Sequence, residues 1–492
     1  MPHSGWLTSP LTALSHRQPK VCCVLSGGGS RASFQLGALD YLYRNDPDFA
    51  PSIFVGASAG SILASGLAQD MDRDAQHRFT ISVMEIWRGL REPAQMFTPR
   101  PWMVRAMAEA PGWLDMVASH TPAPEPAPRT FPKLSFLRTS GPSTPDPRGH
   151  HGAGPLEMAL QPDEEFEPEW SLGTLAQLFS NVGKLPRIGG DLLAIHNGME
   201  RTKSMYRPGP VLLQLLDPEV FAPARVRDSG TTLRIAMVAL ESGELRFMRE
   251  DGALVDRRDT VFDHGPHPLA TGVLASCAIP AVFRPVPLGT ETYVDGGVRD
   301  NLPVQLAMEH LGADKTYLIS SKGIGVPTRQ SMRDADLFAI VMRSTEILID
   351  EAGRDELEYA ATTGATVIQP ELDVHDAMSV DPGLIAINID YGWLRAAERH
   401  LGLEEAHTSR HRRIIALRVR CLRLENEFLE ARAADDVLPT LTRAKSEMRA
   451  ELESCDPRAL PEGAELWSST FEKHVVEPEI IPPWIVDEDV TR

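Results

Sequence analysis

The strongest structural signal in the chain is residues 21–39, which read VCCVLSGGGSRASFQLGAL. The apolar run Val21–Ser26 has no polar alternation, which favours a strand buried on both faces of a parallel sheet. Three glycines then form a turn, and apolar residues between Phe34 and Leu42 recur at helical spacing. The stretch therefore predicts a strand, a glycine turn and a helix, in that order.

A second stretch repeats this order further along the chain. Ile53-Phe54-Val55 precede the turn Gly56–Gly60, and apolar residues up to Leu67 follow among small ones. Consecutive strand–turn–helix units need a crossover between their strands, and such units build a mainly parallel sheet. We therefore predict an α/β fold in which both turns lie at the same edge of the sheet.

Composition limits the class of function. The chain has 492 residues, with 49 Lys+Arg against 68 Asp+Glu and a formal net charge of −19. A nucleic-acid binder needs a basic surface to neutralise phosphates, so we exclude nucleic acid as a partner. The sequence shows neither a signal peptide nor an apolar run long enough to span a membrane, which predicts a cytoplasmic protein. A local basic patch would still allow peripheral contact with a membrane.

Composition also divides the chain. We expect residues 1–20 to be disordered or extended, residues 21–398 to form the main domain, and residues 399–492 to form C-terminal helices and a tail. Residues 121–161 are rich in proline and glycine, which predicts a poorly ordered surface excursion. An inert insertion is favoured there over a lid.

The C-terminal region carries an apolar stripe. Its members follow a 3-4-3-4 spacing typical of one long helix: Ile414, Leu417, Cys421, Leu424 and Phe428. We expect this stripe to pack on the main domain, with a homo-oligomer contact as the alternative. Residues 395–423 hold eight Arg against three Glu. A solvated helix face is the favoured interpretation, and a lipid-headgroup contact is the alternative.

The second turn, Gly56-Ala57-Ser58-Ala59-Gly60, has the pattern G-x-S-x-G between a strand and a helix. At such a turn the serine backbone is strained and its hydroxyl is exposed, and a Cβ at either glycine would collide with the turn. The helix N-terminus offers N–H groups and positive dipole to a developing oxyanion. The pattern indicates Ser58 as a nucleophile; a plain helix start capped by Ser58 is the alternative.

The first turn, Ser26–Ala32, reads SGGGSRA and allows two interpretations. It fits the dinucleotide fingerprint G-x-G-x-x-A, but the second strand ends at Ser58 and not at the acidic residue that would bind a ribose. No Gly-Lys-Ser/Thr follows, which excludes a P-loop. The other interpretation is that successive glycine amides form a cradle for negative charge beside Ser58.

A serine nucleophile needs a base. His310, His375 and His400 lie downstream, but none is in a conspicuous turn. Asp295 ends the short strand ETYVD and is followed by two glycines, which would allow another loop to approach closely. Taken alone, an Asp-Gly turn is ordinary.

The three motifs GGGSRA, GASAG and DGG, in this order, make the chain resemble the patatin-like phospholipase family, in particular its bacterial-type serine acyl hydrolases. That family combines a glycine-rich oxyanion loop, a G-x-S-x-G nucleophile turn and a D-G-A/G base motif. The blocks LATGVLASCAIPAVFRPV before DGG and NLPVQLAMEHLGA after it also look similar. The resemblance covers Val21–Gly312 and extends toward Arg399. It departs at Ala32, where the family usually has glycine, which puts the close packing of the following helix in question.

The resemblance implies a three-layer α/β/α catalytic domain over residues 21–398, with C-terminal helices, and a Ser–Asp dyad in place of a triad. Ser58 would attack an ester carbonyl while Asp295 accepts its proton. The implied oxyanion loop contains Gly27, Gly28, Gly29 and Arg31. The implied nucleophile turn contains Gly56 and Gly60, and the implied base motif contains Gly296 and Gly297.

The function implied by the resemblance is a lipid acyl hydrolase of the phospholipase A or lysophospholipase type, which takes a lipid ester and needs neither metal nor cofactor. An acyltransferase or thioesterase with the same nucleophile is one alternative, and an inactive scaffold is another. A groove for the acyl chain is a further expectation, although core packing explains the same residues equally well. The candidates for it are Trp102, Met103, Met107, Trp113 and Met116.

Overall fold

The structure is a computed structural model that describes residues 19–105, 198, 201–323, 325, 331–333, 337–430, 434–472 and 482–484. The expected excursion at residues 121–161 and nearly all of residues 1–20 lie outside the described residues. So do three of the five groove candidates, Met107, Trp113 and Met116.

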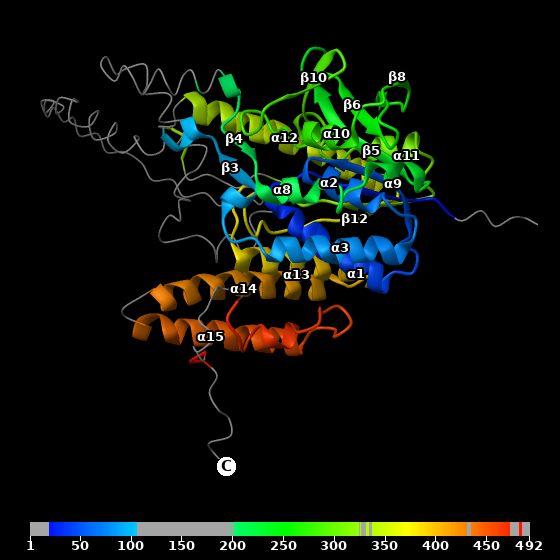
Figure 1. Cartoon of the computed structure of the whole chain (residues 1–492). Helices are drawn as coiled ribbons and strands as arrows, with labels where there is room; N and C mark the ends of the chain where they lie inside the picture. Colours follow the sequence, from blue (N-terminus) through cyan, green and yellow to red (C-terminus); the bar gives the residue numbers. More distant parts are fainter. Residues whose placement is uncertain are drawn as a thin grey trace, which may run out of the picture.

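A ten-stranded mixed sheet forms the centre of the described part of the chain (Figure 1). Its parallel part has the order β12 (Thr366–Ile368), β11 (Lys315–Ile319), β1 (Val21–Leu25), β2 (Pro51–Ala57), β5 (Thr232–Ala239). Antiparallel pairing adds β6 (Leu245–Arg249), β7 (Leu254–Val255), β8 (Val261–Asp263), β9 (Val286–Leu288) and β10 (Glu291–Asp295). The predicted α/β fold with a mainly parallel sheet is confirmed.

The apolar run that opens the sheet is buried on both faces. All five residues of β1 are buried, with Cys22 and Val24 in one apolar cluster and Cys23 and Leu25 in the other. Successive strand residues point to opposite faces, so a strand covered on both sides must be apolar throughout. This is why the run lacks polar alternation.

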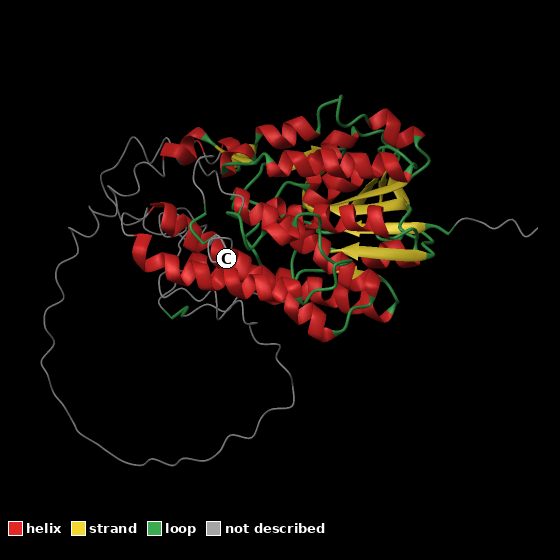
Figure 2. Cartoon of the chain, turned by 90° about the horizontal axis from the view of Figure 1, so that it is seen from below, coloured by secondary structure: helices red, strands yellow, loops and turns green. Residues whose placement is uncertain are grey.

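Helices cover both faces of the sheet, which gives three layers (Figures 1 and 2). One apolar cluster contains residues of α1 (Ala32–Asn45), α2 (Ala59–Leu67), α3 (Arg73–Arg88), α8 (Pro210–Leu215), α9 (Pro223–Asp228), α10 (Leu269–Ser276) and α13 (Pro382–Leu401). The other contains residues of α11 (Val304–Glu309) and α12 (Leu337–Thr362).

Four short 3-10 helices are also described: η1 (Gly29–Arg31), η2 (Pro93–Gln95), η3 (Gly296–Val298) and η4 (Ala464–Leu466). A separate two-stranded sheet pairs β3 (Phe97–Pro99) with β4 (Tyr206–Pro208).

Two long helices, α14 (Glu405–Glu430) and α15 (Ala434–Glu453), lie outside α13 on the side away from the sheet (Figure 1). Ile414 and Cys421 of the predicted stripe are fully buried in the same cluster as α1 and α13, and Leu417, Leu424 and Phe428 pack against it. The stripe therefore packs on the rest of the chain. Among the described helices, none has the length and apolar character needed to cross a membrane.

The basic segment 395–423 is less solvated than its sequence suggests. Arg418 is fully buried, and its guanidinium binds Glu472 through two contacts of 2.9 Å and Asp390 through a third of 2.9 Å. Five of the eight arginines have carboxylate partners: Arg395, Arg410, Arg412, Arg413 and Arg418. The favoured interpretation of a solvated face is wrong for Arg395 and Arg418, which are buried, whereas Arg410 and Arg412 are half-buried and Arg413 is exposed. The paired arginines of α14 join that helix to α13, α15 and the C-terminal segment.

Candidate active site

Ser58 lies in the turn between β2 and α2, as its pattern predicts. Its backbone has φ 50° and ψ −127°, a conformation that L-residues rarely adopt and that marks a strained turn. The Ser58 amide donates to the Ser276 hydroxyl at 2.9 Å, which holds this conformation from α10. The side chain is largely enclosed, since the residue is 6% exposed.

The two glycines of this turn permit close backbone contacts. A Cβ on Gly60 would lie 2.3 Å from the Leu25 carbonyl oxygen, and one on Gly56 would lie 2.5 Å from the Gly60 carbonyl oxygen. Any larger residue at Gly60 would push α2 away from the end of β1. The glycines therefore let α2 begin directly behind Ser58.

Sheet topology brings Asp295 to Ser58. Strand β6 pairs with residues 234–238 of β5, so β2 and β10 must share the opposite edge of β5. β2 ends there with Ala57 opposite Ala236, and β10 ends with Asp295 opposite Met237. The two strands run toward each other along one edge, and their ends place the serine and the carboxylate side by side.

The Asp295 carboxylate is buried, and only one of its two oxygens accepts a hydrogen bond from the described residues. Its Oδ1 accepts a hydrogen bond from the Gly297 amide at 2.7 Å, while Oδ2 has no partner of good geometry among the described residues. Burial raises the pKa of Asp295 to about 6, and the nearby Ser58 hydroxyl and the Gly297 amide oppose that rise. A carboxylate with a free oxygen and a pKa near 6 can accept a proton at neutral pH.

The glycine loop lies directly against this pair. A Cβ on Gly27 would be 2.8 Å from Ser58 Cβ. The Gly27 amide donates to Asn301 Oδ1 and the Arg31 amide donates to the Gly28 carbonyl. Within the described residues, the amides of Gly28 and Gly29 have no acceptor. Of the four predicted oxyanion-loop residues, Gly28 and Gly29 are thus the ones with backbone donors to offer.

A neighbouring loop holds the glycine turn in place. The Ser30 amide donates to the Ala377 carbonyl at 2.9 Å, and the Arg31 guanidinium pairs with Asp373 at 3.5 Å. Gly29 has φ +57° and a Cβ there would be 2.3 Å from the same Ala377 oxygen, so the turn requires glycine at this position. Arg31 therefore fixes the loop by its side chain. Ala32 is fully buried with an ordinary helical φ of −57°, so its extra methyl fits.

The histidines considered as bases lie elsewhere. His375 Nδ1 contacts the Asp376 carbonyl at 2.9 Å, His400 contacts the Tyr41 hydroxyl, and His310 lies beside Glu309. Burial is the main cause that lowers the pKa of His375 to about 4, so its ring is neutral at pH 7. Among the described residues, no histidine hydrogen-bonds to Ser58 or Asp295.

An apolar pocket opens beside Ser58 and Gly29. It encloses about 450 Å³, including the part open to solvent. The other lining residues are Ala59, Ile62, Trp87, Met96, Phe97, Val211, Leu212, Leu215, Cys277, Ile279 and Phe283. Such a lining suits a hydrocarbon chain. The expected groove residue Trp102 is buried and bonds Thr202 Oγ1 at 3.0 Å, and neither it nor Met103 lines this pocket.

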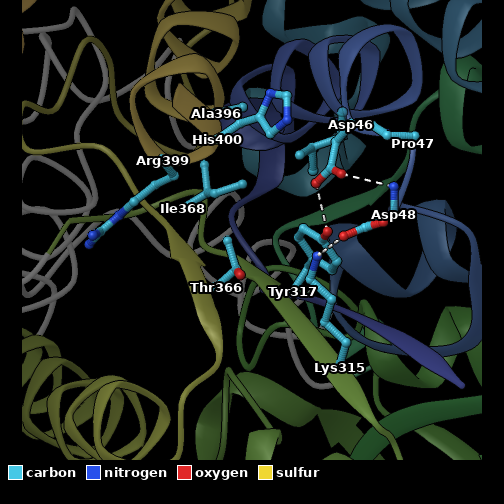
Figure 3. Close-up of a pocket in the computed structure, with 11 residues that line it drawn as sticks. Asp46, Pro47, Asp48, Lys315, Tyr317, Thr366, Ile368, Ala396, Arg399 and His400 are labelled. Carbon is cyan, nitrogen blue, oxygen red and sulfur yellow. Dashed lines mark hydrogen bonds and ion pairs between the residues drawn. The ribbon is translucent and has the colours of Figure 1, made fainter. Parts of the chain in front are cut away.

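A larger cavity of about 600 Å³ lies near the amino ends of β11 and β12 (Figure 3). Ser58, in contrast, follows the carboxyl end of β2. The polar groups of the cavity are largely paired with one another. Asp46 accepts from the Tyr317 hydroxyl at 2.6 Å, and Lys315 contacts Asp48 at 3.3 Å. With these groups satisfied, the cavity lacks the reactive pair found beside the smaller pocket.

Sequence patterns missed several residues of this site. Asn301 contacts the glycine loop through two side-chain hydrogen bonds, and Ser276 contacts the Ser58 turn through one. Isolated contacts of this kind leave no spacing signal in the sequence. Trp87, Phe97 and Phe283 come from separate segments of the chain and form one pocket wall only after folding. The block NLPVQLAMEHLGA does begin at Asn301, and its position after DGG was the one available hint.

Solved structures that align with the chain differ from it widely. VipD from Legionella pneumophila aligns with 15% identity over 93% of each chain, with a TM-score of 0.33. The type III effector ExoU from Pseudomonas aeruginosa aligns with 14% identity over 92% of this chain and 71% of its own, with a TM-score of 0.26. Human GIVD cytosolic phospholipase A2, in complex with methyl gamma-linolenyl fluorophosphonate, aligns with 12% identity over 72% of this chain and 44% of its own, with a TM-score of 0.25. No curated protein sequence matches the chain.

The family model for patatin-like phospholipase matches residues 23–308. The matched range contains the glycine loop, the Ser58 turn, Asp295 and Asn301, and it spans more than half of the chain. The chain belongs to the patatin-like phospholipase family, a family of lipid hydrolases.

Proposed function

We propose that Ser58 and Asp295 form a catalytic dyad and that the chain is a lipid acyl hydrolase of the phospholipase A or lysophospholipase type. One observation carries the proposal. Ser58, with a strained backbone at the start of α2, lies beside the buried Asp295 carboxylate, which has one free oxygen, and beside an apolar pocket. The serine supplies a nucleophile, the carboxylate a base, and the pocket a place for an acyl chain.

The first half-reaction transfers the acyl group to the enzyme. Ser58 Oγ attacks the ester carbonyl while Asp295 Oδ2 accepts its proton. The amides of Gly28 and Gly29 donate to the oxyanion of the tetrahedral intermediate, supported by the positive end of α2. When the intermediate collapses, the bond to the alcohol breaks and the alcohol leaves with the proton that Asp295 held.

The second half-reaction releases the fatty acid. Asp295 accepts a proton from a water molecule, whose oxygen attacks the acyl carbon on Ser58. The same two amides stabilise the second oxyanion. Collapse of this intermediate returns the proton from Asp295 to Ser58 Oγ and frees the carboxylic acid.

Covalent labelling tests the nucleophile. The purified chain is treated with a fluorophosphonate, and peptide mass spectrometry locates the adduct. We expect the adduct on Ser58, with no labelling of Ser58→Ala and full labelling of Ser82→Ala, an exposed serine of α3. An unlabelled Ser58, under conditions that label a control serine hydrolase, would refute the proposal.

Hydrolysis of a short-chain nitrophenyl ester tests the base. Asp295→Asn should lower kcat at least about 10³-fold, as loss of a member of a catalytic unit commonly does. It should still fold, because asparagine keeps the acceptor for the Gly297 amide and removes a buried charge. A folded Asp295→Asn that kept most of the activity would rule Asp295 out as the base.

A further inference from the structure

A cluster of cationic side chains lies beside the apolar pocket. Residues 97–105, 201–210 and 281–288 contain no Asp or Glu, although the chain as a whole has a net charge of −19. Their cationic residues are Arg100, Arg105, Arg201, Lys203, Arg207 and Arg284. A local excess of this kind in an acidic protein creates a positive field that attracts anions.

The backbone joins these three segments into one surface. β3 and β4 pair with Thr98 opposite Arg207, and the Arg100 amide donates to the Met205 carbonyl at 2.9 Å. The amides of Met205 and Tyr206 then donate to the carbonyls of residues 281 and 282, at 2.8 and 2.9 Å. Arg284 follows two residues later. Segments far apart in the sequence thus present their arginines from one small region of the fold.

These cations have no carboxylate partners within the described residues, in contrast to Arg410, Arg413 and Arg418 of α14. Arg100 is half-buried and donates from Nε to the Ser204 hydroxyl at 2.8 Å, a neutral acceptor. Burial lowers the pKa of Arg100, and the positive charges of Arg284 and Arg207 lower it further. Like charges that repel one another in this way bind an anion favourably.

Two of the segments that carry the cluster also line the pocket. Phe97, which begins β3, stacks on Phe283 with ring centroids 5.8 Å apart, and both rings line the pocket. Arg284 directly follows Phe283. Exposed apolar side chains lie close by: Val104 is 50% exposed, and Leu213, on the helix that also supplies Leu212 to the pocket, is 59% exposed. Cationic and exposed apolar residues together fit a lipid with an anionic headgroup.

We propose that Arg100, Arg207 and Arg284 bind the phosphate of a phospholipid whose acyl chain occupies the apolar pocket. This inference rests on the proposed function and deepens it by assigning the residues that recognise the headgroup phosphate of its substrate. Guanidinium groups match phosphate oxygens in geometry and charge. A free phosphate could use the arginines but not the pocket, and a neutral glyceride could use the pocket but not the arginines.

Binding is measured first, so that the test does not depend on turnover. The probe is a short-chain phosphatidylglycerol below its critical micelle concentration, titrated into Ser58→Ala protein. Two further substitutions, Arg207→Gln and Arg284→Gln, are then added to the Ser58→Ala protein to give the Gln variants. Each should raise the Kd for phosphatidylglycerol at least about tenfold, since one hydrogen bond to a charged group contributes that order of affinity. Arg207→Lys with Arg284→Lys should keep most of the affinity. Arg227→Gln on α9, at the other end of the molecule (Figure 1), is the matched control and should change nothing.

Three results would overturn the inference. The Gln variants could bind the monomeric phospholipid as well as the parent does. Inorganic phosphate alone could bind as tightly as the phospholipid, which would remove the role of the acyl chain. The Gln variants could lose binding only to phosphatidylglycerol vesicles and not to monomers, which would assign the cluster to neighbouring membrane lipids.

Turnover separates this inference from the proposed function. With Ser58 restored, the Gln variants should hydrolyse the monomeric phospholipid at least about tenfold less efficiently and a phosphate-free nitrophenyl ester at an unchanged rate. Equal losses on both esters would contradict the phosphate site. A parent protein that binds the phospholipid through these arginines and hydrolyses neither ester would refute the proposed function while leaving the phosphate site intact.

Discussion

The Gly27 amide donates a hydrogen bond to Asn301 Oδ1 at 2.9 Å, and Asn301 Nδ2 returns one to the Gly27 carbonyl at 3.4 Å. Asn301 thereby ties the glycine loop that follows β1 to the segment that follows Asp295. A Cβ on Gly297 would lie 3.0 Å from the same Oδ1, so the side chain also lies against the base motif. One amide group therefore links the glycine loop to the segment that follows Asp295, and with it the proposed oxyanion donors to the proposed base.

Replacement of Asn301 tests this positioning role. Asn301→Ala frees the Gly27 amide and loosens the glycine loop, so we expect kcat to fall on the order of 10- to 100-fold. KM should stay within about threefold, because the apolar pocket is untouched. Asn45→Ala removes another asparagine that bonds to backbone, far from the site, and should have no effect on either constant. An Asn301→Ala variant in which KM rises and kcat is unchanged would contradict the positioning role.

The raised pKa of Asp295 predicts a pH profile. As the proposed base, Asp295 must be ionised to accept a proton, and burial raises the pKa of its carboxyl group to about 6. We expect kcat/KM to rise tenfold per pH unit below about pH 6 and to level off above it. The measurement is hydrolysis of a soluble ester whose leaving group does not titrate in this range. A profile flat down to pH 4.5 would show that a group with an ordinary carboxyl pKa limits the rate.

The apolar pocket predicts a limit on acyl length. Ile279 lines the pocket, and Ile279→Trp fills part of its volume with an indole ring. Hydrolysis of a four-carbon ester should stay within about threefold, while kcat/KM for a twelve-carbon ester should fall at least about tenfold as several methylenes lose their burial. Met71→Trp adds the same side chain at an exposed site after α2 and is the control. Equal effects on both esters would place the acyl chain elsewhere.

The buried Arg418 predicts how α14 is held. Its fully buried guanidinium binds Glu472 and Asp390, so Arg418→Ala leaves the buried carboxylate of Glu472 without its partner and should lower the free energy of unfolding by about 3–5 kcal/mol. Arg413→Ala removes a partly exposed pair with Glu451, which should contribute at most about 1 kcal/mol. Denaturant unfolding measures both. Similar values for the two variants would mean that the buried cluster adds little beyond an ordinary surface pair.

The local motifs of the site could be predicted from the sequence because each consists of a short run of neighbouring residues. A doubly covered strand must be apolar throughout, and β1 is. A turn that runs straight into a helix needs glycines where backbones touch, and Gly56 and Gly60 meet this need. The residues of each motif lie within about five positions of one another, so a pattern can reveal them even where, as at Gly60, the contact is with another strand. The resemblance to a family added the pairing of Ser58 with Asp295, which no local rule would supply.

Only the tertiary structure decided what those motifs face. Residues 234–238 of β5 are covered by β6, and this leaves one edge on which Ala57 and Asp295 end beside each other. Which glycine amides remain free depends on Asn301, which lies more than 270 residues away in sequence. The paired arginines of α14 look as basic in sequence as those around β3 and β4, which have no carboxylate partner among the described residues. Packing between distant segments brings Asp390, Glu451 and Glu472 to the arginines of α14.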